Sequence, residues 1–111
     1  MNLETLAIIH ETMRARMERD AIALRTITER LATLEADRDA LLAPVEIDPA
    51  DDAAIAGLVA QRYHRLRRSK AAEIDARIAE VRHEHSVAEQ LVADALGEVR
   101  AVKRLLGDRR R

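Results

Sequence analysis

Residues 3 to 43 contain neither glycine nor proline and repeat apolar side chains at alternating intervals of three and four residues. This period places the apolar residues in one stripe along an α-helix, and the stripe needs a partner surface to cover it. The sequence therefore predicts a first helix over residues 2–43. The twelve stripe positions are Leu3, Leu6, His10, Met13, Met17, Asp20, Leu24, Ile27, Leu31, Leu34, Arg38 and Leu41.

A turn is predicted directly after this helix. Pro44 lacks an amide hydrogen and disfavours helical geometry at the preceding residue, so it ends the first helix. Asp48 is suited to cap a second helix, and Pro49 is suited to its first position. We therefore expect a turn over residues 44–48.

The second helix is predicted over residues 49–106. Gly107 provides the left-handed conformation in which many helices end, and residues 107–111 then form a charged tail. A short turn joins two helices antiparallel, so we expect one all-α domain over residues 1–111, an antiparallel two-helix coiled-coil hairpin with a longer second helix. The expected seam of the second helix runs through Ile55, Val59, Arg62, Leu66, Lys70, Ile74, Ile78, Val81, His85, Ala88, Val92, Ala95, Val99, Val102 and Leu106.

The second predicted helix is longer than the first, and a turn at residues 44–48 pairs residue i with about residue 92 − i. In that register the apolar stripe of residues 90–106 has no partner on the first helix. Leaving these side chains in water loses about 1.5–3 kcal/mol of burial free energy per large side chain. Three covers remain open: a second copy of the chain, a different protein, or a fold-back at Gly97. Another chain is favoured, because a folded-back helix of about ten residues is marginally stable. We predict partner binding at this end through Leu3, Leu6, Val92, Leu96, Val99, Val102 and Leu106.

Charge is segregated around the predicted turn, although the formal net charge of the chain is −1. Residues 44–52 carry four acids and no base, whereas residues 53–72 carry five bases and no acid. The basic segment 62–70 invites a nucleic-acid hypothesis. However, Tyr63 is the single aromatic residue, and the broad basic footprint and stacking platform of nucleic-acid binders are missing. A solvated or protein-binding face is the favoured interpretation.

The chain contains no cysteine, which excludes disulfides, cysteine-ligated metals and a cysteine nucleophile. His83 and His85 diverge by about 200° around a helix and cannot hold one ion together, whereas His10 and His85 on the seam are geometrically possible ligands. Polar packing at a seam layer is the favoured interpretation. We therefore expect no metal and no cofactor.

Composition also predicts the compartment. The lack of cysteine favours the cytoplasm, and the N-terminal residues lack the basic and apolar regions of a signal peptide. Nothing approaches the run of about 20 apolar residues that a membrane span needs. We expect a cytoplasmic protein that does not insert into a membrane.

The sequence offers little for catalysis. Ser69 and Ser86 have no pocket in a two-helix rod, and no glycine-rich phosphate loop is present. The nearest small all-α enzyme class is similar to chorismate mutase, in which inward Arg and Lys side chains line the site. Arg38, Arg62 and Lys70 lie on the predicted seam, but the helix lengths and the terminal motif differ from that class. We expect that the chain is not an enzyme.

The pattern of the whole chain resembles the FliJ-type stalk proteins of flagellar and related type III secretion export. The resemblance rests on the heptad-bearing first helix from Leu3, the short turn, and a longer second helix with Tyr63 just past the turn and an Arg-rich end. It implies a cytoplasmic coiled coil, similar to the shaft of rotary ATPases, that inserts the end bearing both termini into a hexameric export ATPase. It also implies contact with an export gate protein near the hairpin, here through Arg62, Tyr63, Leu66 and Arg67.

Two main functions are therefore expected. The first is a coiled-coil stalk or adaptor that couples a hexameric export ATPase to the flagellar or type III protein export machinery. The alternative is a self-associating coiled-coil scaffold or regulatory protein that forms a homodimer through residues 90–106. A chorismate mutase-like small enzyme is the minor alternative.

Overall fold

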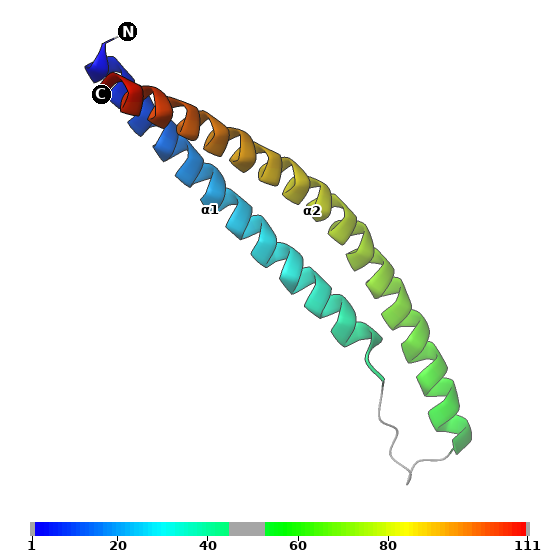
Figure 1. Ribbon diagram of the computed structural model, residues 1–111. Coiled ribbons are helices and arrows are strands. Elements are labelled where there is room, and N and C mark those ends of the chain that lie inside the picture. The colour runs from blue at the N-terminus through cyan, green and yellow to red at the C-terminus, as the bar shows by residue number, and fades with distance from the viewer. Residues whose placement is uncertain (1, 45–52, 111) are drawn as a thin grey trace. The chain divides into compact units, whose positions relative to one another are not determined.

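The computed structural model describes residues 2–44 and 53–110, which form two long α-helices (Figure 1). Helix α1 spans Leu3–Leu42 and helix α2 spans Ala53–Arg110. No strand occurs within these described ranges. The predicted all-α hairpin with a longer second helix is confirmed.

Local chemistry accounts for both ends of α1. The Oδ1 atom of Asn2 accepts a hydrogen bond from the Thr5 amide at 2.7 Å, which is the arrangement of a helix N-cap. Pro44 follows the last helical residue by two positions, as expected for a helix stopped by proline. Apart from Pro44, the predicted turn 44–48 lies outside the described residues, and so does the predicted cap at Asp48 and Pro49.

The end of α2 differs from the sequence prediction. The helix does not stop at Gly107 but continues to Arg110, because Gly107 does not have the positive φ of a helix-ending glycine. The predicted charged tail is therefore helical over residues 107–110. The helix is also continuous through Gly97, so the last segment does not fold back there.

The helices pack against each other in two compact units. The terminal unit consists of Met1–Glu29 with His83–Arg111, and the turn unit consists of Arg30–Arg82. Each unit contains one segment of α1 and one segment of α2. Their contacts are described separately below.

An apolar seam holds the terminal unit together. Leu6, Val102 and Leu106 form a buried cluster. At the other end of the same unit, the Nε2 atom of His85 lies 3.0 Å from the Oγ1 atom of Thr28. Rising residue numbers on α1 thus meet falling numbers on α2, and the two segments are antiparallel.

The turn unit has the same antiparallel order. Arg82 pairs with Glu35 at 3.3 Å, and Arg38 pairs with Asp75 at 3.4 Å. The carboxylates of Asp75 and Asp39, in that order of effect, raise the pKa of Arg38 above its ordinary value. Exposed ion pairs of this kind contribute little to stability. They mark the register, while the apolar seam supplies the stability.

The register predicted from the sequence is wrong. It places Thr28 opposite about residue 64, whereas the structure places Thr28 against His85, about six helical turns further along α2. It also places Arg38 near Asp51 and Asp52, which lie outside the described residues, whereas in the structure Arg38 forms an ion pair with Asp75.

Burial of apolar side chains explains the observed register. The predicted register sets Leu31 opposite Gln61 in the polar segment 61–70, whereas the observed ion pairs of the turn unit set it near Val81, which is buried. Covering a large apolar side chain contributes about 1.5–3 kcal/mol. Doubling the length of a connecting loop costs only about 0.6 kcal/mol. A gain at several layers of the seam therefore outweighs the benefit of a tight turn.

The seam positions can now be compared with their burial. The stripe predicted on α1 is confirmed, because every position except Leu3 is buried or half-buried. The seam predicted on α2 is confirmed from Ile74 to Leu106. Before Ile74 it is wrong, since the predicted residues are exposed: Ile55, Val59, Arg62, Leu66 and Lys70. The side chains buried or half-buried there are Ala56, Ala60, Arg67 and Ala71.

Candidate partner-binding surface on α2

Within the turn unit, α2 extends past the end of α1 (Figure 1). Arg67 of α2 donates a hydrogen bond to the carbonyl oxygen of Ala40, two residues before α1 ends. The first turns of α2, from Ala53 onward, therefore lie beyond the last turn of α1. The surplus length of the second helix is at the turn-proximal end and not at the end with both termini.

Large apolar side chains are exposed on this extension and beside the last turn of α1. Leu58 is 67% exposed, Val59 is 60% exposed and Leu66 is 56% exposed. At about 100° per residue, these three and the exposed Arg62 and Arg65 fall within an arc of about 120° on one side of the helix. We call these five residues the apolar–basic face.

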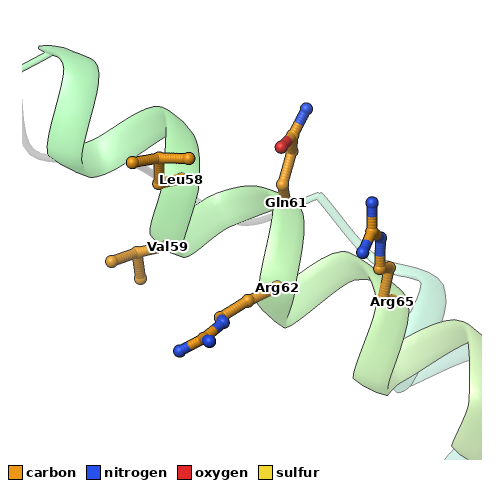
Figure 2. A pocket seen from close by; sticks show the side chains of 5 residues that line it. All are labelled: Leu58, Val59, Gln61, Arg62 and Arg65. Atoms are coloured by element: carbon orange, nitrogen blue, oxygen red, sulfur yellow. The ribbon is translucent and has the colours of Figure 1, made fainter.

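Figure 2 shows how the side chains of this region are arranged. In this view Val59 and Arg62 point downward, toward one edge of the face, and Arg65 points upward, toward its other edge, with Gln61 next to it. Together with Leu58 they line an open depression of about 400 Å³. The surface is apolar toward the start of α2 and cationic further along.

Arg67 lies on a neighbouring side of α2 and fastens the two helices. Its guanidinium carbon is 5.4 Å from the centre of the Tyr63 ring, within the range of a cation–π interaction. Its Nη2 atom donates to the Ala40 carbonyl at 2.9 Å. The last four carbonyl groups of a helix have no amide donor within that helix, and this bond provides a donor for one of them.

We expect the substitution Arg67→Ala to lower the free energy of unfolding by about 1 kcal/mol, because it removes both the bond to Ala40 and the contact with Tyr63. Urea denaturation followed by circular dichroism measures the change. The control is Arg68→Ala at the exposed neighbouring arginine. Equal losses in the two variants would show that Arg67 does not fasten α1 to α2.

The residues predicted for the turn-proximal contact fall into two groups. Arg62 and Leu66 belong to the apolar–basic face, whereas Tyr63 contacts Arg67, and Arg67 bonds to the end of α1. Sequence reasoning did not assign Leu58, Val59 and Arg65 to a partner site, since it placed Val59 on the seam. The signal that could have found the two apolar residues is their spacing from Arg62. Leu58 lies four residues before Arg62, Val59 lies three residues before it, and Leu66 lies four residues after it.

The predicted contact at the other end is corrected by burial. The prediction treated residues 90–106 as an uncovered stripe, but they pack against the first part of α1 in the terminal unit. Leu3 alone of the predicted residues is exposed. The half-buried members are Val92 and Leu96, and the buried ones are Leu6, Val99, Val102 and Leu106.

The histidines do not share a seam layer. His85 lies against Thr28 and also forms an ion pair with Glu89 at 2.7 Å when it is protonated. The Nε2 atom of His10 is buried without a hydrogen-bond partner among the described residues, and His83 is exposed. In the same described ranges, no group of three or more His, Asp or Glu side chains is arranged to hold a metal ion.

The basic residues considered for an enzyme site do not converge. Arg38 is held by Asp75 and Asp39, whereas Arg62 and Lys70 are exposed away from the seam. The arrangement expected from a chorismate mutase-like site, with inward basic side chains on one seam, is therefore not formed by these three residues.

Neither described helix has a stretch long and apolar enough to cross a membrane.

Comparison with known proteins identifies no relative of this chain. No family model matches the chain, and no curated protein or solved structure matches it significantly.

Proposed function

We propose that this chain is a coiled-coil adaptor that binds a partner protein through the apolar–basic face. The observation that carries the proposal is the exposure of Leu58 and Val59 on the part of α2 that extends beyond α1, and of Leu66 beside the last turn of α1. Apolar side chains that share one face of a helix at this spacing are typical of helix-mediated recognition.

The specific form of this adaptor is a stalk of a protein export system. The resemblance to FliJ-type proteins implies a gate contact near the hairpin, and the apolar–basic face lies in that region. Contact with a hexameric export ATPase would use the outward side chains of the terminal unit. The exposed apolar ones there include Leu3, Ile8 and Leu105.

Self-association through residues 90–106 is not supported. Val99, Val102 and Leu106 already pack inside the terminal unit, so a homodimer at this stripe would first have to separate α1 from α2. An isolated helix pair gains most of its stability from this packing.

Photo-crosslinking in the native host tests the adaptor function. A photoreactive amino acid at Val59 is expected to give a covalent product with a specific protein, and the same residue at Ala79 is the control. Ala79 is exposed on the same helix, within the turn unit, but outside the apolar–basic face. Mass spectrometry identifies the product, and an export gate protein would support the stalk form. Absence of a product at Val59, or identical products at both positions, would refute the adaptor function.

A further inference from the structure

We infer that the partner of the apolar–basic face is an acidic amphipathic helix, with apolar side chains against Leu58, Val59 and Leu66 and carboxylates against Arg62 and Arg65. The inference rests on the proposed adaptor function and specifies the chemistry of its partner. It is carried by three features of the face: its spacing, its unbalanced charge and the position of Arg62.

The spacing of the face matches that of a helix–helix seam. Val59, Arg62 and Leu66 follow one another at intervals of three and four residues, and Leu58 flanks Val59. This alternation keeps one stripe facing a partner helix. The stripe spans about two helical turns, or roughly 11 Å, which is enough for a short helix to pack along it.

The charge of the region is not balanced from within it. Residues 53–72 carry five bases and no acid. Among the described residues, neither Arg62 nor Arg65 forms an ion pair, whereas Arg38 and Arg82 are paired with carboxylates. A partner with carboxylates at matching positions would supply counter-charges that none of the described residues provides, and would steer its own approach.

A second copy of this chain does not meet this requirement. Two such faces packed together would bring Arg62 and Arg65 of both copies into one interface without a carboxylate from either face. Like charges placed opposite each other at an interface oppose association. The face therefore favours a different chain with the opposite charge.

A membrane surface fits the face less well than a protein helix. Arg62 lies in the middle of the stripe, between Val59 and Leu66, and not along its edge. An interfacial helix buries a continuous apolar side in the lipid and keeps its basic residues on the polar side. A guanidinium within the apolar arc is better satisfied by a carboxylate of a partner helix, which binds it in a bidentate manner.

The test measures binding of synthetic helices to the full-length chain by fluorescence anisotropy. The first probe is a labelled peptide of about three heptads with Leu at the a and d positions and Glu at the flanking e and g positions. The second probe has Lys in place of Glu. The wild-type chain is expected to bind the acidic peptide at least about tenfold more tightly than the basic one, and the difference should shrink with added salt.

Charge reversal in the chain provides the decisive comparison. The double variant Arg62→Glu, Arg65→Glu is expected to lose at least about tenfold affinity for the acidic peptide and to gain affinity for the basic peptide. The control variant Arg100→Glu, Arg104→Glu carries the same charge change at exposed positions of the terminal unit and should bind like the wild type. Circular dichroism verifies that both variants are folded.

Three results would overturn the inference. The first is that the chain binds the acidic and the basic peptide equally well, or binds neither of them. The second is binding to phosphatidylglycerol vesicles without binding to the acidic peptide, which would assign the face to a membrane. The third is self-association of the chain that Val59→Ser abolishes. If Val59 crosslinks to a protein in cells but the peptides show no charge preference, the inference fails and the adaptor function stands. If Val59 gives no crosslink, the adaptor function itself fails.

Discussion

Replacing Val99 with aspartate is expected to unfold the terminal unit. Val99 is 7% exposed and belongs to the seam that α2 forms with the first part of α1. A carboxylate at this position loses its hydration without gaining a partner, at a cost of about 3–5 kcal/mol. Circular dichroism melting should show a large loss of stability. Hydrogen exchange should show that amides of residues 3–29 and 83–110 lose more protection than those of the turn unit.

The control for this substitution is Val87→Asp. Val87 is in the same unit and on the same helix but is 49% exposed, so its aspartate remains hydrated. The comparison separates the two registers. If Val99→Asp melts like Val87→Asp, residues 90–106 are uncovered in solution, as the sequence-based register requires, and the observed packing of the terminal unit is wrong.

Replacing Ile78 with aspartate is expected to have an effect of similar size in the turn unit. Ile78 is 2% exposed, the lowest value among the buried residues. It lies on the seam between Asp75 and Arg82, each of which pairs with a residue of α1. We expect a loss of about 3–5 kcal/mol, because the new carboxylate is buried and unpaired. Hydrogen exchange should place the loss of protection in residues 30–42 and 53–82.

The matched control is Ala79→Asp, at the next position of the same helix. Ala79 is exposed, so this variant reports the lower helix propensity of aspartate, which costs about 0.5–0.7 kcal/mol relative to alanine. The difference between the two variants gives the contribution of burial. Similar melting temperatures would mean that Ile78 is not a seam residue.

The sequence is sufficient to predict the two helices and the seam of α1. Pro44 predicts where α1 ends, and the regular spacing from Leu6 to Leu41 predicts which side of α1 is covered. These features follow from local chemistry and from a period that a single helix displays by itself. They do not depend on how the two helices slide along each other.

The register could not be predicted in the same way, because two stripes compete on the first part of α2. One contains Val59 and Leu66, and the other contains Ala56 and Ala60. The two stripes are rotated from each other by about 100° around the helix, which is the rotation of one residue. Periodicity favours the bulkier stripe. Beside the last turns of α1, the side of α2 that carries Arg67 and Ala71 is the covered one, which leaves Leu66 exposed, and Val59 lies beyond the end of α1. Periodicity carries no information about where a partner helix ends.

The candidate surface was predicted in part for a related reason. Arg62 and Leu66 were assigned to a partner, but Val59 was assigned to the seam, and the terminal stripe that ends at Leu106 was assigned to a partner although it is buried. The assignment of the terminal stripe follows from the displaced register, whereas Val59 was placed by periodicity, and Arg62 and Leu66, also placed on the seam, were assigned to a partner through the family resemblance. The unbalanced bases of residues 53–72 did not depend on the register and pointed to the same end of the molecule.

The half-buried alanines of early α2 have a thermodynamic consequence for recognition. Ala56 and Ala60 bury little apolar surface, so tertiary packing contributes little to holding these turns in a helix. Their helicity depends mainly on intrinsic propensity, and such segments have low local free energies of opening. A partner that packs on the opposite side would supply the burial that the alanines lack. Association would then be coupled to completion of the helix, with a heat-capacity decrease larger than the contact area alone accounts for.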